Sequence, residues 1–539
     1  MAAELRQKVL SSKVLRKIAK QSEGLFRLPE SLRSAIAAFI ADYPSQEMKR
    51  NVARLSVALR KRGSKFSTGQ ETEKNDQDHE LLESMVRISS KDSQKGLVPV
   101  HSSVTYEEGH TAAYVASRMP SVYASICRVL YEVFRRIPDF KPSTMLDYGS
   151  GPGTAFWALH AVWPDAIVQA NAVESSRAMA FACRRLLQDK KVAPSIRYYK
   201  NLQDLQRSLP QDERGHDLVI SSYALGELQT MKERISTIRQ LWALTRDILV
   251  LIEPGTPQGS KLIRESRAHI LALERKRFLR QKVDGDVSPD RGEGDKKGTA
   301  VKQHIMLGNA FVVAPCPHDG VCPMDKTDQW CHFIQRLERT PSQRTTKRLV
   351  KTGALRGYED EKFSFVVLRR GIRPRIQWPL DGVELKLSED EQQQDQEFKV
   401  DDYDSQSDGH SSSEELSSIQ TAEDQSDAEE SEATSDEKGY GSNDEYSTIL
   451  ASGDQSNAEE SEATSGEEGK QVADLGSGWA RIVFAPIRRG KHVFLDVCCS
   501  TKKDGSEGKL DRLIVSRSQD AVLHKQAKKS RWGDLWPSR

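Results

Sequence analysis

The sequence lacks long hydrophobic runs and is poor in cysteine. No run of 18 apolar residues occurs in the chain, which excludes a membrane-spanning helix. Seven cysteines among 539 residues do not make the dense disulfide framework of small secreted domains. The chain is 37% hydrophobic and 29% charged, and it is long enough for two to four domains with at least one large core.

A formal net charge of +2 conceals an uneven distribution of charge. Residues 388–470 hold 27 acidic and three basic residues, a net charge of −24, and contain a tandem repeat (424–439 and 454–469) with almost no apolar side chains. We expect this acidic insert to be disordered, because it cannot bury a core. The rest of the chain holds 77 Lys and Arg against 51 Asp and Glu, a net charge of +26. That excess favours a nucleic-acid partner, bound through its phosphates.

The first part of the chain has helical periodicity. Residues 1–30 carry seven Lys and Arg and three Glu among regularly spaced apolar residues. This composition fits either an organelle transit peptide or an ordinary amphipathic helix. Helical patterns continue over 29–57 and 111–136, so we assign 1–140 to an N-terminal helical region.

From residue 144 onward, short apolar runs alternate with helical segments. This alternation predicts an α/β fold, a doubly wound parallel sheet with helices on both faces, over residues 141–380. The expected strands are 145–147, 166–173, 217–221, 248–252 and 363–368, and the expected helices include 155–162 and 175–187. Residues 275–297 are charged and are interpreted as a solvated loop, while 475–539 regain strand character as a C-terminal segment.

A glycine loop follows the first of these strands. Its segment LDYGSGPGT places four residues at alternate positions: Asp147, Gly149, Gly151 and Gly153. Glycines there permit positive φ and close approach to a ligand, and the next helix offers free N–H groups. The G-x-G-x-G spacing disfavours a dinucleotide site. Glu174 ends the second strand, where its carboxylate can accept hydrogen bonds from the ribose of a nucleoside.

This combination resembles the S-adenosylmethionine site of class I methyltransferases; the alternative is a turn that only packs strand against helix. No catalytic residue accompanies it. The loop at 220–228 reads ISSYALGEL, without the Pro-Pro-aromatic motif of base-nitrogen methyltransferases and without a cysteine nucleophile. Glu227 is either a base or a favourable charge at a helix start. The pattern points away from an active enzyme, although oxygen methylation needs little beyond proximity.

A cysteine-rich loop occupies residues 314–333. Its thiols are spaced C-x₅-C-x₈-C, at Cys316, Cys322 and Cys331. Thiolates on a loop with Pro and Gly suit tetrahedral zinc or an iron–sulfur cluster. Cys498 or Cys499 can supply a fourth thiolate if the C-terminal strands fold back. His318 or His332 would instead complete a Cys₃His zinc site, and free buried thiols are the remaining alternative.

At this point several segments of the chain resemble one family. They are AAYVASRMPSVYA, TMLDYGSGPGTAFWAL, LVISSYALGEL, APCPHDGVCPM and WGDLWP. They resemble the methyltransferase-like proteins that assemble the mitochondrial small ribosomal subunit, a family that includes methyltransferase-like protein 17 and its yeast and bacterial relatives. The resemblance extends from about residue 28 to the C-terminus, without the acidic insert and the segment near 275–297.

The resemblance implies an assembly factor of the mitochondrial matrix that binds immature small-subunit rRNA and ribosomal proteins. It implies a methyl-donor fold that can keep S-adenosylmethionine without catalysis; an active rRNA methyltransferase is the alternative. It also implies a [4Fe–4S] cluster with four ligands, Cys316, Cys322, Cys331 and Cys498, with Cys499 as the alternative fourth. We expect a monomer with no membrane contact.

Overall fold

The computed structural model describes most of the chain outside the acidic insert. The described residues are 8–64, 106–164, 166–188, 195–285, 309–347, 356–374, 383–386 and 478–537. The insert predicted at 388–470 lies outside them. None of the helices in these ranges is long and apolar enough to cross a membrane.

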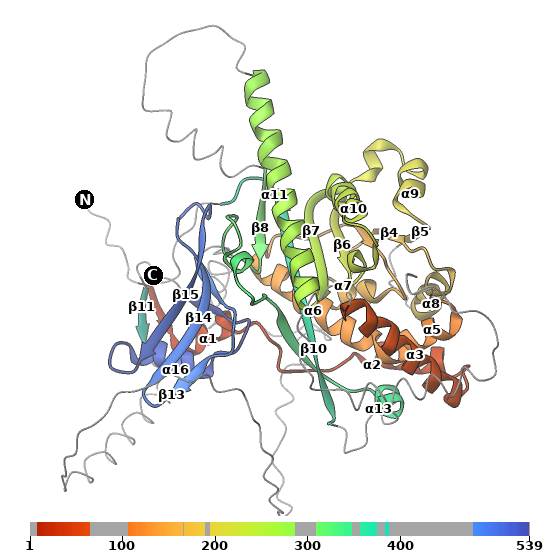
Figure 1. Cartoon of the computed structure of the whole chain (residues 1–539), viewed down its shortest axis with the longest axis horizontal. Coiled ribbons are helices and arrows are strands. Elements are labelled where there is room, and N and C mark those ends of the chain that lie inside the picture. Colours follow the sequence, from red (N-terminus) through yellow and green to blue (C-terminus); the bar gives the residue numbers. More distant parts are fainter. Residues whose placement is uncertain are drawn as a thin grey trace, which may run out of the picture. The chain divides into compact units, whose positions relative to one another are not determined.

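Nine of the described strands form one central sheet (Figure 1). Along the sheet they are β5 (Ser195–Tyr199), β4 (Gln169–Val173), β3 (Thr144–Tyr148), β6 (His216–Ser222), β7 (Thr245–Pro254), β10 (Tyr358–Arg370), β9 (Phe333–Glu338) and β2 (Leu25–Phe26), with β8 (Ala310–Ala314) also paired to β10. Strands β3 to β7 are parallel, and β10 runs antiparallel beside β7. A five-strand parallel half in this order, followed by an antiparallel strand, is the arrangement of class I methyltransferases.

The inner parallel strands β3, β4, β6 and β7 are largely buried, as the apolar runs predict, while the edge strand β5 is not. Leu218 and Ile220 of β6 face one hydrophobic core, and Val219 between them faces another. The first core is covered by α2 (Glu30–Ile40), α3 (Ser45–Ser64), α5 (Glu108–Ser117), α6 (Met119–Arg136), α7 (Thr154–Val162) and α8 (Arg177–Leu187). The second is covered by α9 (Leu202–Ser208), α10 (Met231–Ala243) and α11 (Pro257–Gly285). The doubly wound sheet is therefore confirmed.

The C-terminal segment forms a smaller antiparallel sheet. It contains β12 (Trp479–Ile482), β13 (Ile487–Arg489), β14 (His492–Ser500), β15 (Gly508–Ser516) and β16 (Leu535–Pro537), with α16 (Ala521–Lys529) packed on it. Short connecting elements are β1 (Lys8–Ser11), which pairs with β11 (Val383–Lys386), α13 (Pro341–Lys347), and the 3₁₀ turns η1 (Gln211–Arg214), η2 (Leu225–Glu227) and η3 (Pro323–Lys326).

Helix α1 (Ser12–Ala19) packs against the C-terminal sheet. Leu15 and Ala19 are completely buried in the same core as Trp536 of β16. The assignment of 1–140 to one helical region stays a prediction.

The loop predicted at 275–297 is wrong in about its first half. Helix α11 continues to Gly285, and the remaining residues of that segment are not described. Arg, Lys and Glu are good helix formers, so their charge alone did not indicate a loop. Buried Ile270, Leu271 and Glu274 anchor the helix up to that point.

Candidate functional site

The glycine loop joins β3 to α7 with three left-handed residues. The φ angles of Gly149, Gly151 and Gly153 are 69°, 52° and 82°. A Cβ at Gly149 would lie 2.4 Å from the Cβ of Ala224, and one at Gly153 would lie 2.6 Å from Cys183 Sγ. At Gly151 a Cβ would meet no atom within 4 Å. Packing therefore requires the outer two glycines, while the middle one faces open space.

Glu174 lies beside this loop, just after the end of β4. One carboxylate oxygen accepts a hydrogen bond from Gly151 N–H (2.9 Å), and the other accepts one from Ser176 N–H (2.7 Å). Burial raises the pKa of Glu174 despite these bonds. Each oxygen keeps a further lone pair, so the carboxylate can still accept a bond from a ligand hydroxyl.

Asp147 lies at the base of the loop, fully buried within β3. Its Oδ1 has no hydrogen-bond partner in the described part of the chain. Burial, and then the charge of Glu174, raise the pKa of Asp147 to about 8. A buried carboxyl without a partner costs stability, and Asp147 does not line the cleft beside the loop.

A cleft of about 2460 Å³ opens beside Gly149, Gly151 and Glu174. Its volume exceeds the few hundred to about 1,000 Å³ typical of a small-molecule pocket. It extends past Asn201, after β5, and past Tyr223, after β6. The cleft therefore lies at the carboxyl ends of the parallel strands, where ligands of doubly wound sheets bind.

Tyr223 follows β6 at the position where base-nitrogen methyltransferases carry their catalytic motif. It has a φ of 57°, unusual for a bulky residue. Its hydroxyl donates to Glu361 Oε1 (2.9 Å), and Arg118 binds both oxygens of the same carboxylate at 3.0 Å. The Tyr223 hydroxyl is thus hydrogen-bonded to the carboxylate of the Arg118–Glu361 ion pair and is not free to act as a base.

Glu253, at the end of β7, is a site residue that the sequence reasoning missed. Its Oε1 accepts hydrogen bonds from Leu225 N–H (2.9 Å) and Gly226 N–H (3.2 Å). Burial outweighs these bonds and raises its pKa to about 8. The neighbouring Glu227 accepts a hydrogen bond from Tyr106 (2.9 Å). An acid at the carboxyl end of a buried strand, in the phrase LIEPG, was the signal available for Glu253.

The cysteine-rich loop lies between β8 and β9, against the β14–β15 hairpin. Burial, and then the like charges of Cys316, Cys331 and Cys322, raise the pKa of Cys498 well above its ordinary value. The pKa of Cys322 is raised to about 11, first by burial and next by Cys316. Cys322 and Cys331 of the loop pack in one small apolar cluster with Cys498, whereas Cys316 packs against the core under α10 and α11. Side chains around them include Met324, Val483 and Leu510.

Cys498 and Cys499 face opposite sides of β14, because successive strand residues alternate. Cys498 lies in the small apolar cluster with Cys322 and Cys331, whereas Cys499 lies in the core that contains Leu15. Spacing alone left these two cysteines as equal alternatives. The structure places Cys498 toward the loop thiols.

The two histidines of the zinc alternative differ in surroundings. His318 Nε2 lies 3.4 Å from Cys498 Sγ, and its Nδ1 has no partner among the described residues. His332 is packed against Trp532, with ring centroids 4.2 Å apart. In their present side-chain positions, no three or more His, Cys, Asp or Glu side chains of the described residues are grouped as a metal site.

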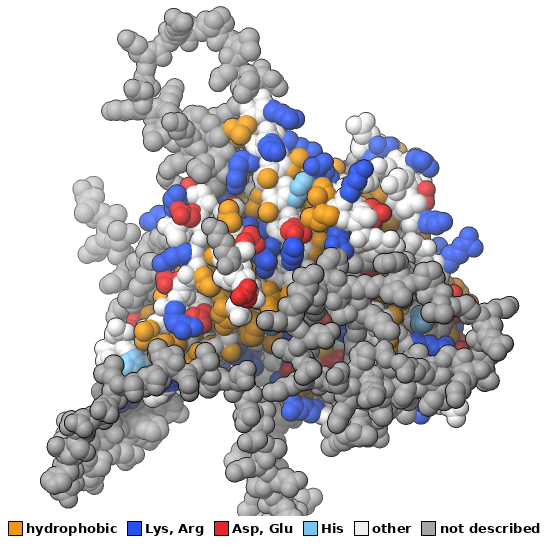
Figure 2. Space-filling view, viewed as in Figure 1, with side chains coloured by type: hydrophobic (Ala, Val, Ile, Leu, Met, Phe, Trp, Pro, Cys, Tyr) orange, Lys and Arg blue, Asp and Glu red, His pale blue; other side chains and the backbone are white. Residues whose placement is uncertain are grey.

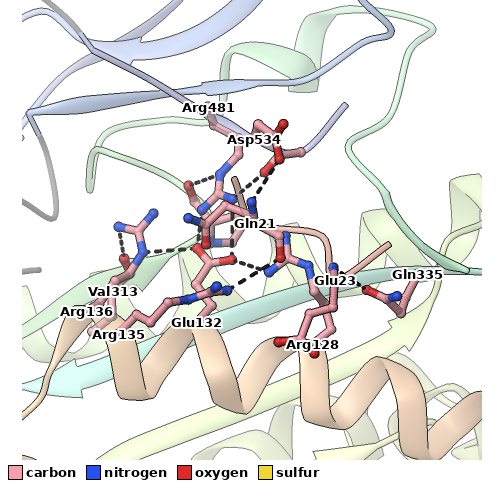
Figure 3. Close-up of polar contacts among 12 residues, drawn as sticks. Gln21, Glu23, Arg128, Glu132, Arg135, Arg136, Val313, Gln335, Arg481 and Asp534 are labelled. Atoms are coloured by element: carbon pink, nitrogen blue, oxygen red, sulfur yellow. Dashed lines mark hydrogen bonds and ion pairs between the residues drawn. The ribbon is translucent and has the colours of Figure 1, made fainter. Parts of the chain in front are cut away.

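A buried ionic network fixes the C-terminal sheet beside the cysteine loop (Figure 3). Glu132 of α6 pairs with Arg128 (3.2 Å), with Arg136 (3.0 Å) and with Arg481 of β12. Burial opposes ionisation of Glu132, but the charges of the three arginines outweigh it and lower its pKa. Arg481 also donates to Pro315 O (3.3 Å), directly before Cys316. Arg481 of β12 is also the strand partner of Cys498 of β14. The network therefore holds Cys498 and the loop that carries the other thiols close to each other.

Comparison with known proteins agrees with these features. The family model "Mitochondrial small ribosomal subunit Rsm22" matches residues 108–279, 292–379 and 428–537. The human ribosome assembly protein METTL17, mitochondrial, is 30% identical over 278 residues, which cover 51% of this chain and 52% of METTL17. The yeast (Saccharomyces cerevisiae) ribosome assembly protein RSM22, mitochondrial, is 25% identical over 504 residues. The match covers 79% of this chain and 67% of RSM22.

Among solved structures, the magnesium protoporphyrin IX methyltransferase of Synechocystis is 13% identical, with a TM-score of 0.24 over 47% of this chain and 84% of that one. The fold assignment rests on the strand order and not on this likeness. The chain spans about half the length of the first curated relatives it matches. The family and these curated relatives are mitochondrial, and so is this protein. With the family model matched over most of its length, the chain belongs to the Rsm22 family of the mitochondrial small ribosomal subunit.

Proposed function

We propose that this protein is an assembly factor of the mitochondrial small ribosomal subunit. It acts in the matrix as a monomer and binds immature small-subunit rRNA and ribosomal proteins through its basic, methyltransferase-like body. A [4Fe–4S] cluster stabilises that body, and no methyl group is transferred. The observation that supports the proposal is that Cys322 and Cys331 of the loop pack in one small cluster with Cys498, in a chain of the Rsm22 family.

The donor set suits an iron–sulfur cluster. Cys316, Cys322, Cys331 and Cys498 would hold it, since four thiolates are the usual ligands of such clusters. When bound, the cluster supplies a covalent cross-link between the loop and β14. Buried Arg267 donates to His318 O (2.7 Å) in the same region. Burial and the neighbouring thiols raise the pKa of Cys498 and of Cys331, and the charges of Arg267 and Arg481 respectively offset only part of that rise.

The glycine loop supports S-adenosylmethionine as a ligand of the cleft. Open space at Gly151, which lines the cleft, suits a bound donor. Glu174 would orient the ribose. Catalysis is not part of the proposal, because Tyr223 and Glu253 are already held by hydrogen bonds. An active S-adenosylmethionine-dependent rRNA methyltransferase is the second candidate, and the intact glycine loop is the observation that favours it.

Complementation separates these two functions. Cells without the endogenous protein receive Cys322→Ser, Cys499→Ser or Glu174→Gln, and small-subunit assembly is followed on gradients. We expect Cys322→Ser to abolish assembly, while the matched Cys499→Ser, on the opposite face of β14, preserves it. Glu174→Gln should also preserve it. Assembly that needs Glu174, together with a methyl mark on rRNA that is lost with it, would establish the enzyme instead.

A further inference from the structure

Helix α11 is packed against the sheet over its first half and exposed over its second. Leu262, Ile263, Ile270 and Leu271 are buried in the core that includes β7, β8 and β10. Beyond Glu274 the pattern changes. The exposed side chains there are Lys276, Arg277, Leu279 and Arg280. In Figure 1 this end of α11 extends beyond the sheet.

The exposed charges of this second half, as far as its side chains are described, are all positive. Glu274 is buried and occupied, because it accepts from Trp242 Nε1 (2.8 Å) and pairs with Arg277 (2.7 Å). Lys276 and Arg280 have no ion pair within the described part of the chain. Two long cations on one helix face, four residues apart, therefore point to solvent unneutralised.

A neighbouring helix extends the same patch. Arg239 of α10 is exposed and donates from Nε to His269 Nε2 on α11 (2.9 Å). Burial lowers the pKa of His269, and the charges of Arg239 and Lys276 lower it further. Arg239 and Lys276 therefore both lie close enough to His269 to make this face locally positive. Figure 2 shows Lys and Arg side chains gathered along α11 and over α10. We call Arg239, Lys276, Arg277 and Arg280 the α11 surface.

The α11 surface lies away from the cofactor cleft. Helix α11 begins at the carboxyl end of β7, where Lys261, Leu262 and Glu265 line the cleft. Arg280 lies 18 residues after Leu262, which is about 27 Å along a helix. None of the four residues of the surface lines the cleft. Binding at this surface therefore needs no methyl donor.

We propose that the α11 surface binds the phosphate backbone of ribosomal RNA, an inference that rests on the proposed function and names the surface that performs it. Exposed Lys and Arg on a rigid element displace counterions from phosphates, which is the main source of sequence-independent affinity. An anionic membrane surface is the alternative partner for such a cationic surface. The surface has one exposed apolar side chain, Leu279, and so lacks the apolar face that membrane helices insert.

The test measures RNA binding by the full-length protein. Fluorescence anisotropy with a labelled RNA of about 30 nucleotides, between about 50 and 200 mM salt, compares wild type with Lys276→Glu/Arg280→Glu. The matched control, Lys17→Glu/Lys20→Glu, makes the same charge change on exposed residues in and just after α1. We expect the α11 variant to bind roughly tenfold more weakly and to lose about 1.4 units of salt slope, while the control stays within about twofold of wild type.

Each result decides the matter. If wild type binds RNA and the α11 variant binds equally well, or the control is weakened as much, the surface is wrong and the proposed function stands. If wild type binds no RNA, both fall. If vesicles with about 30% phosphatidylserine bind through Lys276 and Arg280 while RNA does not, a membrane is the partner and the inference is overturned. Circular dichroism melting verifies that both variants are folded.

Discussion

Arg481 of β12 and Glu132 of α6 form a completely buried ion pair between residues 349 positions apart in the sequence. The pair joins the C-terminal sheet to the methyltransferase-like domain. Arg481 also donates to Gly533 O (2.7 Å), so the same guanidinium binds the end of the chain. The position of Cys498, two strands of sequence later, depends on this connection.

Removing that arginine should therefore destabilise the whole protein. Arg481→Ala leaves the Glu132 carboxylate buried with one cation fewer, which costs about 3–5 kcal/mol. Urea unfolding followed by tryptophan fluorescence measures the change in free energy of unfolding. Arg512→Ala is the control, because the side chain of Arg512, which forms an ion pair with Asp496, is 61% exposed. It should cost about 1 kcal/mol or less. Equal losses in the two variants would show that the buried pair has no special role.

Leu15 tests the position of the N-terminal helix. Leu15→Ala removes a fully buried side chain from the C-terminal core and should lower the free energy of unfolding by about 2–5 kcal/mol. Lys17→Ala, an exposed change on the same helix, should leave it within about 0.5 kcal/mol of wild type. If Leu15→Ala is as stable as Lys17→Ala, α1 does not belong to that core.

Asp147 gives the protein a pH dependence of stability. Its pKa is about 8 in the folded state against 3.8 ordinarily, so between these values the folded protein keeps a proton that the unfolded chain releases. Stability therefore falls as pH rises through this window. Asp147→Asn is neutral throughout and should reduce the loss between about pH 5 and 8 by up to about 4 kcal/mol.

Urea unfolding at the two pH values measures this slope. Asp217→Asn is the control, because hydrogen bonds from Ser143 and Thr144 outweigh partial burial and lower the pKa of Asp217, so its titration lies below the window. That variant should keep the wild-type slope. An Asp147→Asn protein with the wild-type slope would show that Asp147 is ionised in the folded state at neutral pH.

The sequence predicted the central sheet because short, mostly apolar runs alternate with helical segments. It also predicted the glycine loop, whose alternate spacing is a local pattern. Both depend on residues close together in the chain. The extension of α11 was missed because charged side chains are compatible with a helix and with a loop.

The remaining features depend on contacts between distant segments. The Arg481–Glu132 pair and the packing of Leu15 under β16 have no local signal. The choice between Cys498 and Cys499 needs the face of β14 that meets the loop, which adjacent positions in a sequence do not reveal. Glu253 was within reach, since an acid that ends a buried strand usually lies at the site edge of a parallel sheet.

Metal analysis tests the central claim most directly. The full-length protein is purified without oxygen, and iron and acid-labile sulfide are measured per chain beside Cys498→Ser and Cys499→Ser. We predict about four of each in wild type and in Cys499→Ser, with broad absorption near about 400 nm, and a loss of both in Cys498→Ser. A wild-type protein that is folded, colourless and free of iron would contradict the account.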